Sequence, residues 1–262
     1  MYKKAILIIA VGIFACLFWF WLKPWIDSPA RFLQVGIWLK PLLMFAVLTS
    51  AIGLSFLLLK DYVLKILISV LAGLPFFFVF GFNQFYLGAF VLMILLFMYA
   101  IRNIQAETDG RTKINIRIIM QRGLPRIVTA MLVMISFAFF FSPNIQASAK
   151  SKQLPPTVKE VIERTVSSFL GGEIKSLPPR ERQQIENQVI TQVITQFTDF
   201  LEPYFRYFPP ILAFGLFLIL QGLSFIFVWL AVGISVLLFW VMKRAGFMRL
   251  KIVQKEAEEL EF

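Results

Sequence analysis

The sequence contains no histidine and only one cysteine, Cys16, among its 262 residues. Without histidine the chain cannot form histidine-ligated zinc or haem sites, Ser-His dyads or the histidine motif of zinc proteases. With one cysteine it cannot form an intramolecular disulfide or a cysteine-based metal site, and we interpret Cys16 as a lone buried thiol. We therefore expect no bound metal and no cofactor.

Acidic residues are scarce as well, with 15 Asp and Glu against 26 Lys and Arg. None of them falls inside the apolar runs that we assign to the membrane, so carboxylate proton relays lack their residues. Nucleotide-binding glycine motifs are also absent from the sequence. A serine-lysine pairing within residues 148–152 stays open, but neighbouring positions in a polar stretch do not make a catalytic dyad. We interpret the protein as a non-enzyme.

Apolar residues dominate what is present: they make up 59% of the chain, and phenylalanine alone occurs 30 times. The mean hydropathy is +0.77. This composition predicts an all-α, polytopic membrane helix bundle of about six transmembrane helices. The predicted spans are residues 5–22, 41–59, 66–80, 85–101 and 127–141, and a long tilted or bent segment at 209–242.

The basic residues predict how these spans are oriented. Residues 102–126 contain six arginines and lysines against only Glu107 and Asp109, and we interpret them as a basic cytoplasmic loop. Placing both termini in the cytoplasm puts most basic loops on that side, whereas a seventh span would expose the basic C-terminal segment outside. We expect a multi-pass protein of a bacterial cytoplasmic (inner) membrane. Its charge then reflects orientation and attraction to the lipid bilayer rather than binding to nucleic acid.

The predicted organisation has three parts: a five-span bundle at 1–141, an extracytoplasmic helical insertion at 142–208, and a last span with a cytoplasmic tail at 209–262. In the insertion, Leu-Pro-Pro at 154–156 and again at 177–179 precedes a helical pattern. Gly171 and Gly172 are expected to end the first helix, and Pro203 to limit the second. The insertion is therefore an amphipathic helical pair.

The second helix of this pair has an apolar ridge with few charges beside it. Its members recur every four residues and are a candidate interaction face: Ile185, Val189, Val193, Phe197 and Leu201. The ridge could simply pack against the first helix and the membrane bundle, or it could bind another membrane or envelope protein or a second copy of the chain. The leading hypothesis is a non-enzymatic subunit or scaffold that presents the pair to an envelope or secretion assembly. The alternative is a channel or transporter component.

A candidate processing site precedes the helical pair. Arg122 and Arg126 form a basic flank, residues 127–141 an apolar core, and Ser142 and Pro143 a helix break. The small residues Ala147 and Ala149 then follow in the spacing of a signal-peptidase site. This arrangement resembles an internal signal sequence, and one interpretation is cleavage after Ala149. The other is that small residues are common in loops that follow a span and that the chain stays intact.

Overall fold

The computed structural model describes residues 2–27, 35–110, 114–152, 154, 156–173 and 178–247. Helices account for nearly all of these residues, and no strand occurs among them, so the predicted all-α fold is confirmed. Within the described residues, seven helices are long and apolar enough to cross a membrane by length and composition. In lipid a helix satisfies its own backbone hydrogen bonds, which is why such a chain folds this way. The chain is a multi-pass membrane protein.

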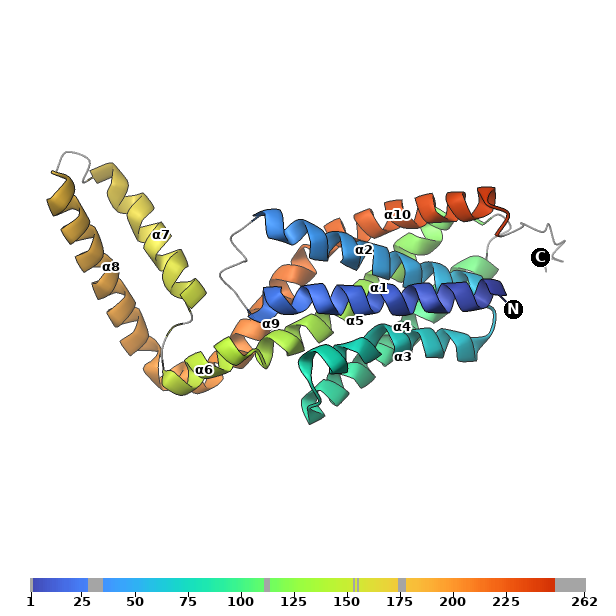
Figure 1. Cartoon of the computed structure of the whole chain (residues 1–262), viewed down its shortest axis with the longest axis horizontal. Helices are drawn as coiled ribbons and strands as arrows, with labels where there is room; N and C mark the ends of the chain where they lie inside the picture. The colour runs from blue at the N-terminus through green and yellow to red at the C-terminus, as the bar shows by residue number, and fades with distance from the viewer. Residues whose placement is uncertain are drawn as a thin grey trace, which may run out of the picture. The chain divides into compact units, whose positions relative to one another are not determined.

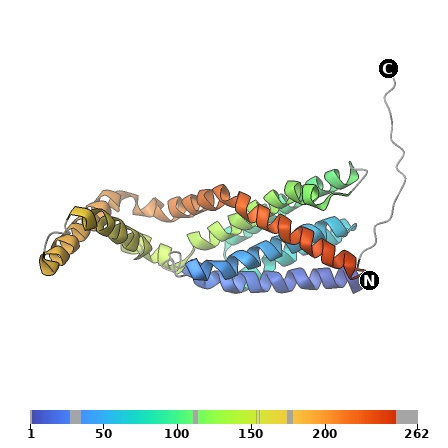
Figure 2. The same cartoon turned by 90° about the horizontal axis from the view of Figure 1, so that it is seen from above.

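The chain divides into two compact units. The first contains residues 1–20, 40–134 and 219–262, and the second contains residues 21–39 and 135–218. The helices that contribute most of the first unit are α1 (Tyr2–Asp27), α2 (Val35–Leu58), α3 (Tyr62–Phe80), α4 (Gln84–Asp109), α5 (Ile116–Phe140) and α10 (Ser224–Arg244) (Figures 1 and 2). The second unit contains α6 (Pro143–Ser151), α7 (Pro156–Glu173), α8 (Pro179–Leu201), η2 (Glu202–Tyr207) and most of α9 (Phe208–Gly222).

Trp19 lies at the centre of an aromatic core in the first unit. Its side chain is fully buried, and its indole Nε1 donates a 2.9 Å hydrogen bond to the Ala72 carbonyl of α3. Its ring packs edge-on against Phe76 at 4.9 Å, while the neighbouring Phe18 contacts Phe45 of α2 at 5.6 Å between ring centroids. Edge-to-face pairs of this kind add stabilisation beyond the area they bury. The aromatic core therefore joins α1 to both α2 and α3.

Two glycines allow helices of the first unit to approach closely. A Cβ at Gly53 of α2 would lie 3.0 Å from Leu124 of α5, and a Cβ at Gly123 would overlap the side chain of Ile104 on α4. Small residues at helix contacts are the usual device of membrane bundles, because apolar side chains gain little from leaving lipid. These positions let α5 pack closely against α2 and α4.

The predicted basic loop at 102–126 is largely helical, which corrects the sequence interpretation. Helix α4 continues through Asp109, and α5 already begins at Ile116. The apolar runs alone predicted both helices too short. Arginine and glutamate have good helix propensity, so each helix continues beyond its apolar part. As a result, the helix that carries the fourth predicted span also includes two acidic residues near its C-terminal end.

Two arginines of α5 have side-chain partners on the neighbouring helix α4. Arg122 of α5 forms an ion pair with Glu107 of α4. The guanidinium of Arg126 lies 5.4 Å from the ring centroid of Tyr99, also on α4, in a cation–π contact. Two of the basic residues, Arg122 and Arg126, therefore lie on α5 and contact α4.

Cys16 is exposed on the surface of α1, so the prediction of a buried thiol is wrong. The buried side of this helix is formed by Val11, Ala15, Trp19 and Leu22, which recur at three- and four-residue spacing. Cys16 is one residue away from this stripe, which rotates its side chain out of the core. Helix α1 is apolar on all sides, so its sequence does not indicate which face is buried.

The long apolar run at 209–242 is divided into α9 and α10 by a turn at Leu223. The bend expected near Gln221 and Gly222 is therefore found one residue further along. Thr129 of α5 donates a 3.2 Å hydrogen bond to the side-chain oxygen of Gln221, which gives this polar side chain a partner. The six-span count, which rests on charge, stays a prediction.

Two buried serines should respond differently to substitution by alanine. The Ser50 hydroxyl of α2 lies 2.6 Å from the Ala46 carbonyl of its own helix and 2.8 Å from the Ala231 carbonyl of α10, and it donates to these two acceptors. The buried Ser235 hydroxyl has no hydrogen-bond partner among the described residues. We expect Ser50→Ala to lower the free energy of unfolding by about 1 kcal/mol and Ser235→Ala to leave it unchanged or raise it. Thermal unfolding in detergent measures both, and the opposite order would contradict this assignment.

Candidate functional site

Helices α7 and α8 form the insertion, and prolines set where each begins. Helix α7 starts at Pro156 and α8 at Pro179, as the Leu-Pro-Pro pattern predicts, because the first helical position does not need an N–H donor. Helix α8 ends at Leu201, just before Pro203 in η2, also as predicted. The expected end at Gly171 and Gly172 is wrong. Helix α7 continues through both to Glu173, because glycine costs only about 1 kcal/mol inside a helix.

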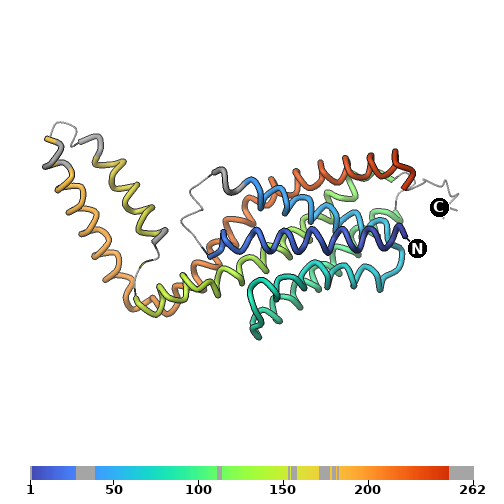
Figure 3. The backbone as a smooth tube through the Cα atoms, viewed as in Figure 1, coloured from blue at the N-terminus to red at the C-terminus, as the bar shows by residue number. Residues whose placement is uncertain are grey.

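The two helices pack against each other as a hairpin (Figure 3). On α7 the half-buried apolar side chains recur every four residues: Val158, Ile162, Val166 and Leu170. No side chain that the structure describes in α7 or α8 is fully buried. The hairpin therefore has a shared apolar seam but no closed core of its own.

The predicted interaction face divides into two groups on α8. Val189, Val193 and Leu201 are half-buried, whereas Ile185 and Phe197 are exposed. The half-buried side also includes Ile190 and Ile194, which the predicted five-residue face leaves out. A strict four-residue ridge drifts around a helix of 3.6 residues per turn, so a pattern that alternates three- and four-residue steps would have found them.

Large aromatic side chains are exposed on both helices of the hairpin. Phe169 of α7 is 78% exposed, and Phe200 of α8 is 71% exposed. The exposed positions of α8 between Thr191 and Gln196 are polar and uncharged, whereas the exposed residue directly before Phe200 is Asp199. Exposed apolar groups on a polar element are typical of surfaces that contact a protein or a membrane. The hairpin therefore presents apolar groups that its own fold does not cover.

Contacts between α6 and η2 hold the two ends of the hairpin together. Lys152, which follows α6, lies 3.0 Å from the Glu202 carboxylate at the start of η2, and α6 packs against η2. Ile145 of α6 also belongs to a buried apolar cluster with Phe139 and Ala213. An exposed ion pair contributes little by itself, so the apolar cluster supplies most of the attachment. The chain thus enters and leaves the hairpin at one anchored point.

Exposed tyrosines follow the hairpin directly. Tyr204 and Tyr207 of η2 are both exposed and lie immediately before the apolar helix α9. Tyrosine and tryptophan gather at membrane–water interfaces because one end of the side chain is apolar and the other is polar. Exposed tyrosines followed directly by an apolar helix are typical of a chain that enters the membrane, here at the start of α9.

The serines and lysines of α6 do not assemble as a dyad. The Lys152 ammonium pairs with Glu202, and the Ser151 hydroxyl donates to the Ser148 carbonyl at 3.4 Å. The described residues also contain no cluster of three or more histidine, cysteine or acidic side chains able to hold a metal ion.

The candidate processing residues Ala147 and Ala149 lie within α6, on either side of the buried Ser148. The start of this segment is held by Ser142, which donates to the Ile26 carbonyl at 3.3 Å, and by Asn144, which donates to the Asp27 carbonyl. A protease that binds its substrate in an extended form could reach the site only after α6 unwinds locally. Cleavage here stays a prediction.

If this site is used, a chain tagged at both ends should give an N-terminal and a C-terminal fragment on immunoblots. We expect slow cleavage, with full-length chain still visible, because the helix must open first. The Ala149→Phe variant should abolish both fragments, because the bulky ring does not fit the small-residue pocket of a signal peptidase. A single full-length band in both samples would exclude the site.

The fold and the hairpin together define an all-α, multi-pass membrane protein with a helical hairpin between its apolar helices. No family model, curated protein or solved structure matches this chain.

Proposed function

We propose that the protein is a non-enzymatic subunit or scaffold of a membrane-bound assembly, and that the α7–α8 hairpin binds a protein of the cell envelope or of a secretion machine. The observation that carries this proposal is the exposure of Phe169 and Phe200 on a hairpin without a fully buried side chain in its described part. A partner that covered either ring would gain about 1.5–3 kcal/mol from its burial. The hairpin is thus stabilised by the complex it enters.

The uncharged flank of α8 supports a protein partner. Thr191, Gln192 and Thr195 are exposed and uncharged. The two threonine hydroxyls donate to carbonyls of α8 and can still accept, and the Gln192 amide can donate and accept, without a charge that must be desolvated. Protein interfaces combine apolar anchors with such polar neighbours and are depleted of lysine and glutamate at their centre. The composition of α8 fits this pattern.

We place the hairpin on the extracytoplasmic side of the cytoplasmic membrane, with both termini in the cytoplasm. Contacts between the two ends of the first unit support a shared side: Lys3 Nζ donates to the carbonyls of Gly246 and Phe247 at 3.1 and 2.8 Å. Lys4 also forms an ion pair with Asp61 in the α2–α3 turn. By the positive-inside rule, this cluster of basic residues belongs in the cytoplasm.

Photo-crosslinking in cells tests the proposal. A photoreactive phenylalanine analogue at Phe200 should give one adduct of defined mass, and the same analogue at the exposed, polar position Glu181 near the start of α8 serves as the control. The complex should copurify in fixed stoichiometry and be lost in Phe200→Glu, because a charge would then be buried at the contact. A monodisperse single chain that conducts ions in liposomes would overturn the proposal in favour of a channel.

A further inference from the structure

A groove between α5 and α10 carries an inference that is independent of the hairpin. Its volume is about 620 Å³, within the range of roughly 300–1,000 Å³ that small-molecule sites occupy. Helix α5 contributes Arg117, Gln121 and Pro125. The wall on α10 consists mainly of apolar residues: Phe225, Val228, Trp229, Val232, Gly233 and Val236.

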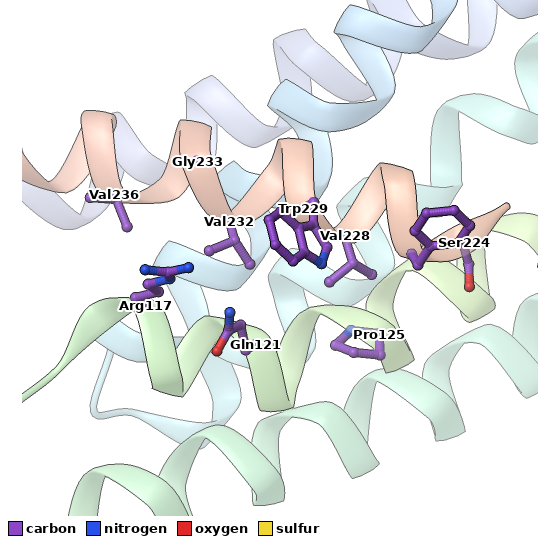
Figure 4. A pocket seen from close by; sticks show the side chains of 10 residues that line it. Arg117, Gln121, Pro125, Ser224, Val228, Trp229, Val232, Gly233 and Val236 are labelled. Carbon is purple, nitrogen blue, oxygen red and sulfur yellow. The ribbon is translucent and has the colours of Figure 1, made fainter.

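The two walls of this groove differ in chemistry: α5 supplies the charged and amide groups, and α10 supplies a mainly apolar wall that begins at Ser224. Figure 4 shows Arg117 and Gln121 reaching from α5 towards α10, with Pro125 further along the same helix. Arg117 lies in the first turn of α5, at the end of the helix, and Pro125 lies eight residues, or about 12 Å, further into it. The cation of the groove therefore lies near the N-terminus of α5, and Pro125 and Ser224 lie at the other end of the groove.

Among the described residues, the arginine in the groove has no partner, in contrast to its neighbours on α5. Arg122 pairs with Glu107 and Arg126 stacks on Tyr99, but Arg117 makes no ion pair or hydrogen bond with any residue that the structure describes. The Gln121 amide likewise has no hydrogen-bond partner in the described part of the chain. A guanidinium and an amide thus face the same groove, and an anion with several acceptor oxygens would satisfy both.

We propose that this groove binds an anionic phospholipid, with the phosphate at Arg117 and Gln121 and an acyl chain along the valines of α10. The guanidinium matches a phosphate in charge and in the geometry of its donors. The apolar wall favours a lipid over free phosphate, because only the lipid buries an acyl chain against Val228 and Val232. Basic pockets between transmembrane helices are a recognised setting for anionic headgroups.

Native mass spectrometry of the purified full-length protein tests this site with phosphatidylglycerol and phosphatidylcholine of identical acyl chains. We expect wild-type protein to retain phosphatidylglycerol on the order of tenfold more than phosphatidylcholine, as one charge-assisted contact implies. Arg117→Gln should abolish this preference. The matched control Lys60→Gln removes a charge from the exposed α2–α3 turn and should keep it.

A second pair of variants tests the apolar wall. A Cβ added at Gly233, which lines the groove, would meet no atom within 4 Å, so the backbone there has room for Gly233→Leu to project into the groove. It should reduce retention of both lipids, whereas Gly88→Leu, at an equally open position on α4, should not. Equal retention of the two lipids by wild type would overturn the proposal, as would an unchanged preference in Arg117→Gln. Full retention in Gly233→Leu would do so as well.

Discussion

Replacing Trp19 by alanine is expected to lower the free energy of unfolding by about 3–5 kcal/mol, the range for removing a large aromatic side chain from a core. The indole is fully buried and contacts Phe76 and Phe80 of α3. Its removal would leave a cavity and also deprive the Ala72 carbonyl of its 2.9 Å hydrogen bond. Thermal or denaturant unfolding in detergent micelles would measure the loss.

The matched variant Trp19→Phe separates these two contributions. It keeps most of the ring contacts with α3 but removes the N–H donor, so we expect a loss of about 1–2 kcal/mol. As a surface control, Trp240→Phe changes a ring that is 56% exposed and should have little effect on stability. Equal stability of wild type and Trp19→Ala would contradict the central place of Trp19 in the first unit.

Introducing aspartate at Val193 should open the α7–α8 hairpin, with an expected cost of about 1–3 kcal/mol. Val193 is half-buried on the seam side of α8, so its replacement places a carboxylate where few groups can pair with it. Limited proteolysis reports the result, since an open hairpin exposes its backbone to cleavage.

The control is Gln192→Asp, at the exposed position one residue earlier on the same helix. It introduces the same charge into the same turn but into solvent, and we expect its digestion pattern to match that of wild type. Equal protease resistance of both variants would show that the seam contributes nothing to the stability of the hairpin. Because the test concerns folding of the pair, it is independent of the crosslinking at Phe200.

Local chemistry explains why much of the hairpin could be predicted from the sequence. The prolines at 156 and 179 lack an N–H and therefore mark helix starts in any tertiary setting. The face of α8 that is half-buried was harder to predict. Ile190 and Ile194 are half-buried beside Val189 and Val193, and the pattern of apolar residues on α8 alone is compatible with several neighbouring faces.

The sequence by itself determined the class of this protein, because long apolar runs can satisfy their backbone only as helices in lipid. The absence of histidine and the single cysteine excluded several kinds of site on composition alone. Only the tertiary structure decided which charges are paired. Arg122 and Arg126 find Glu107 and Tyr99 across the α4–α5 contact, while Arg117 faces α10 and an open groove. Three arginines on one helix look alike in sequence, and the helix that each one faces decides its role.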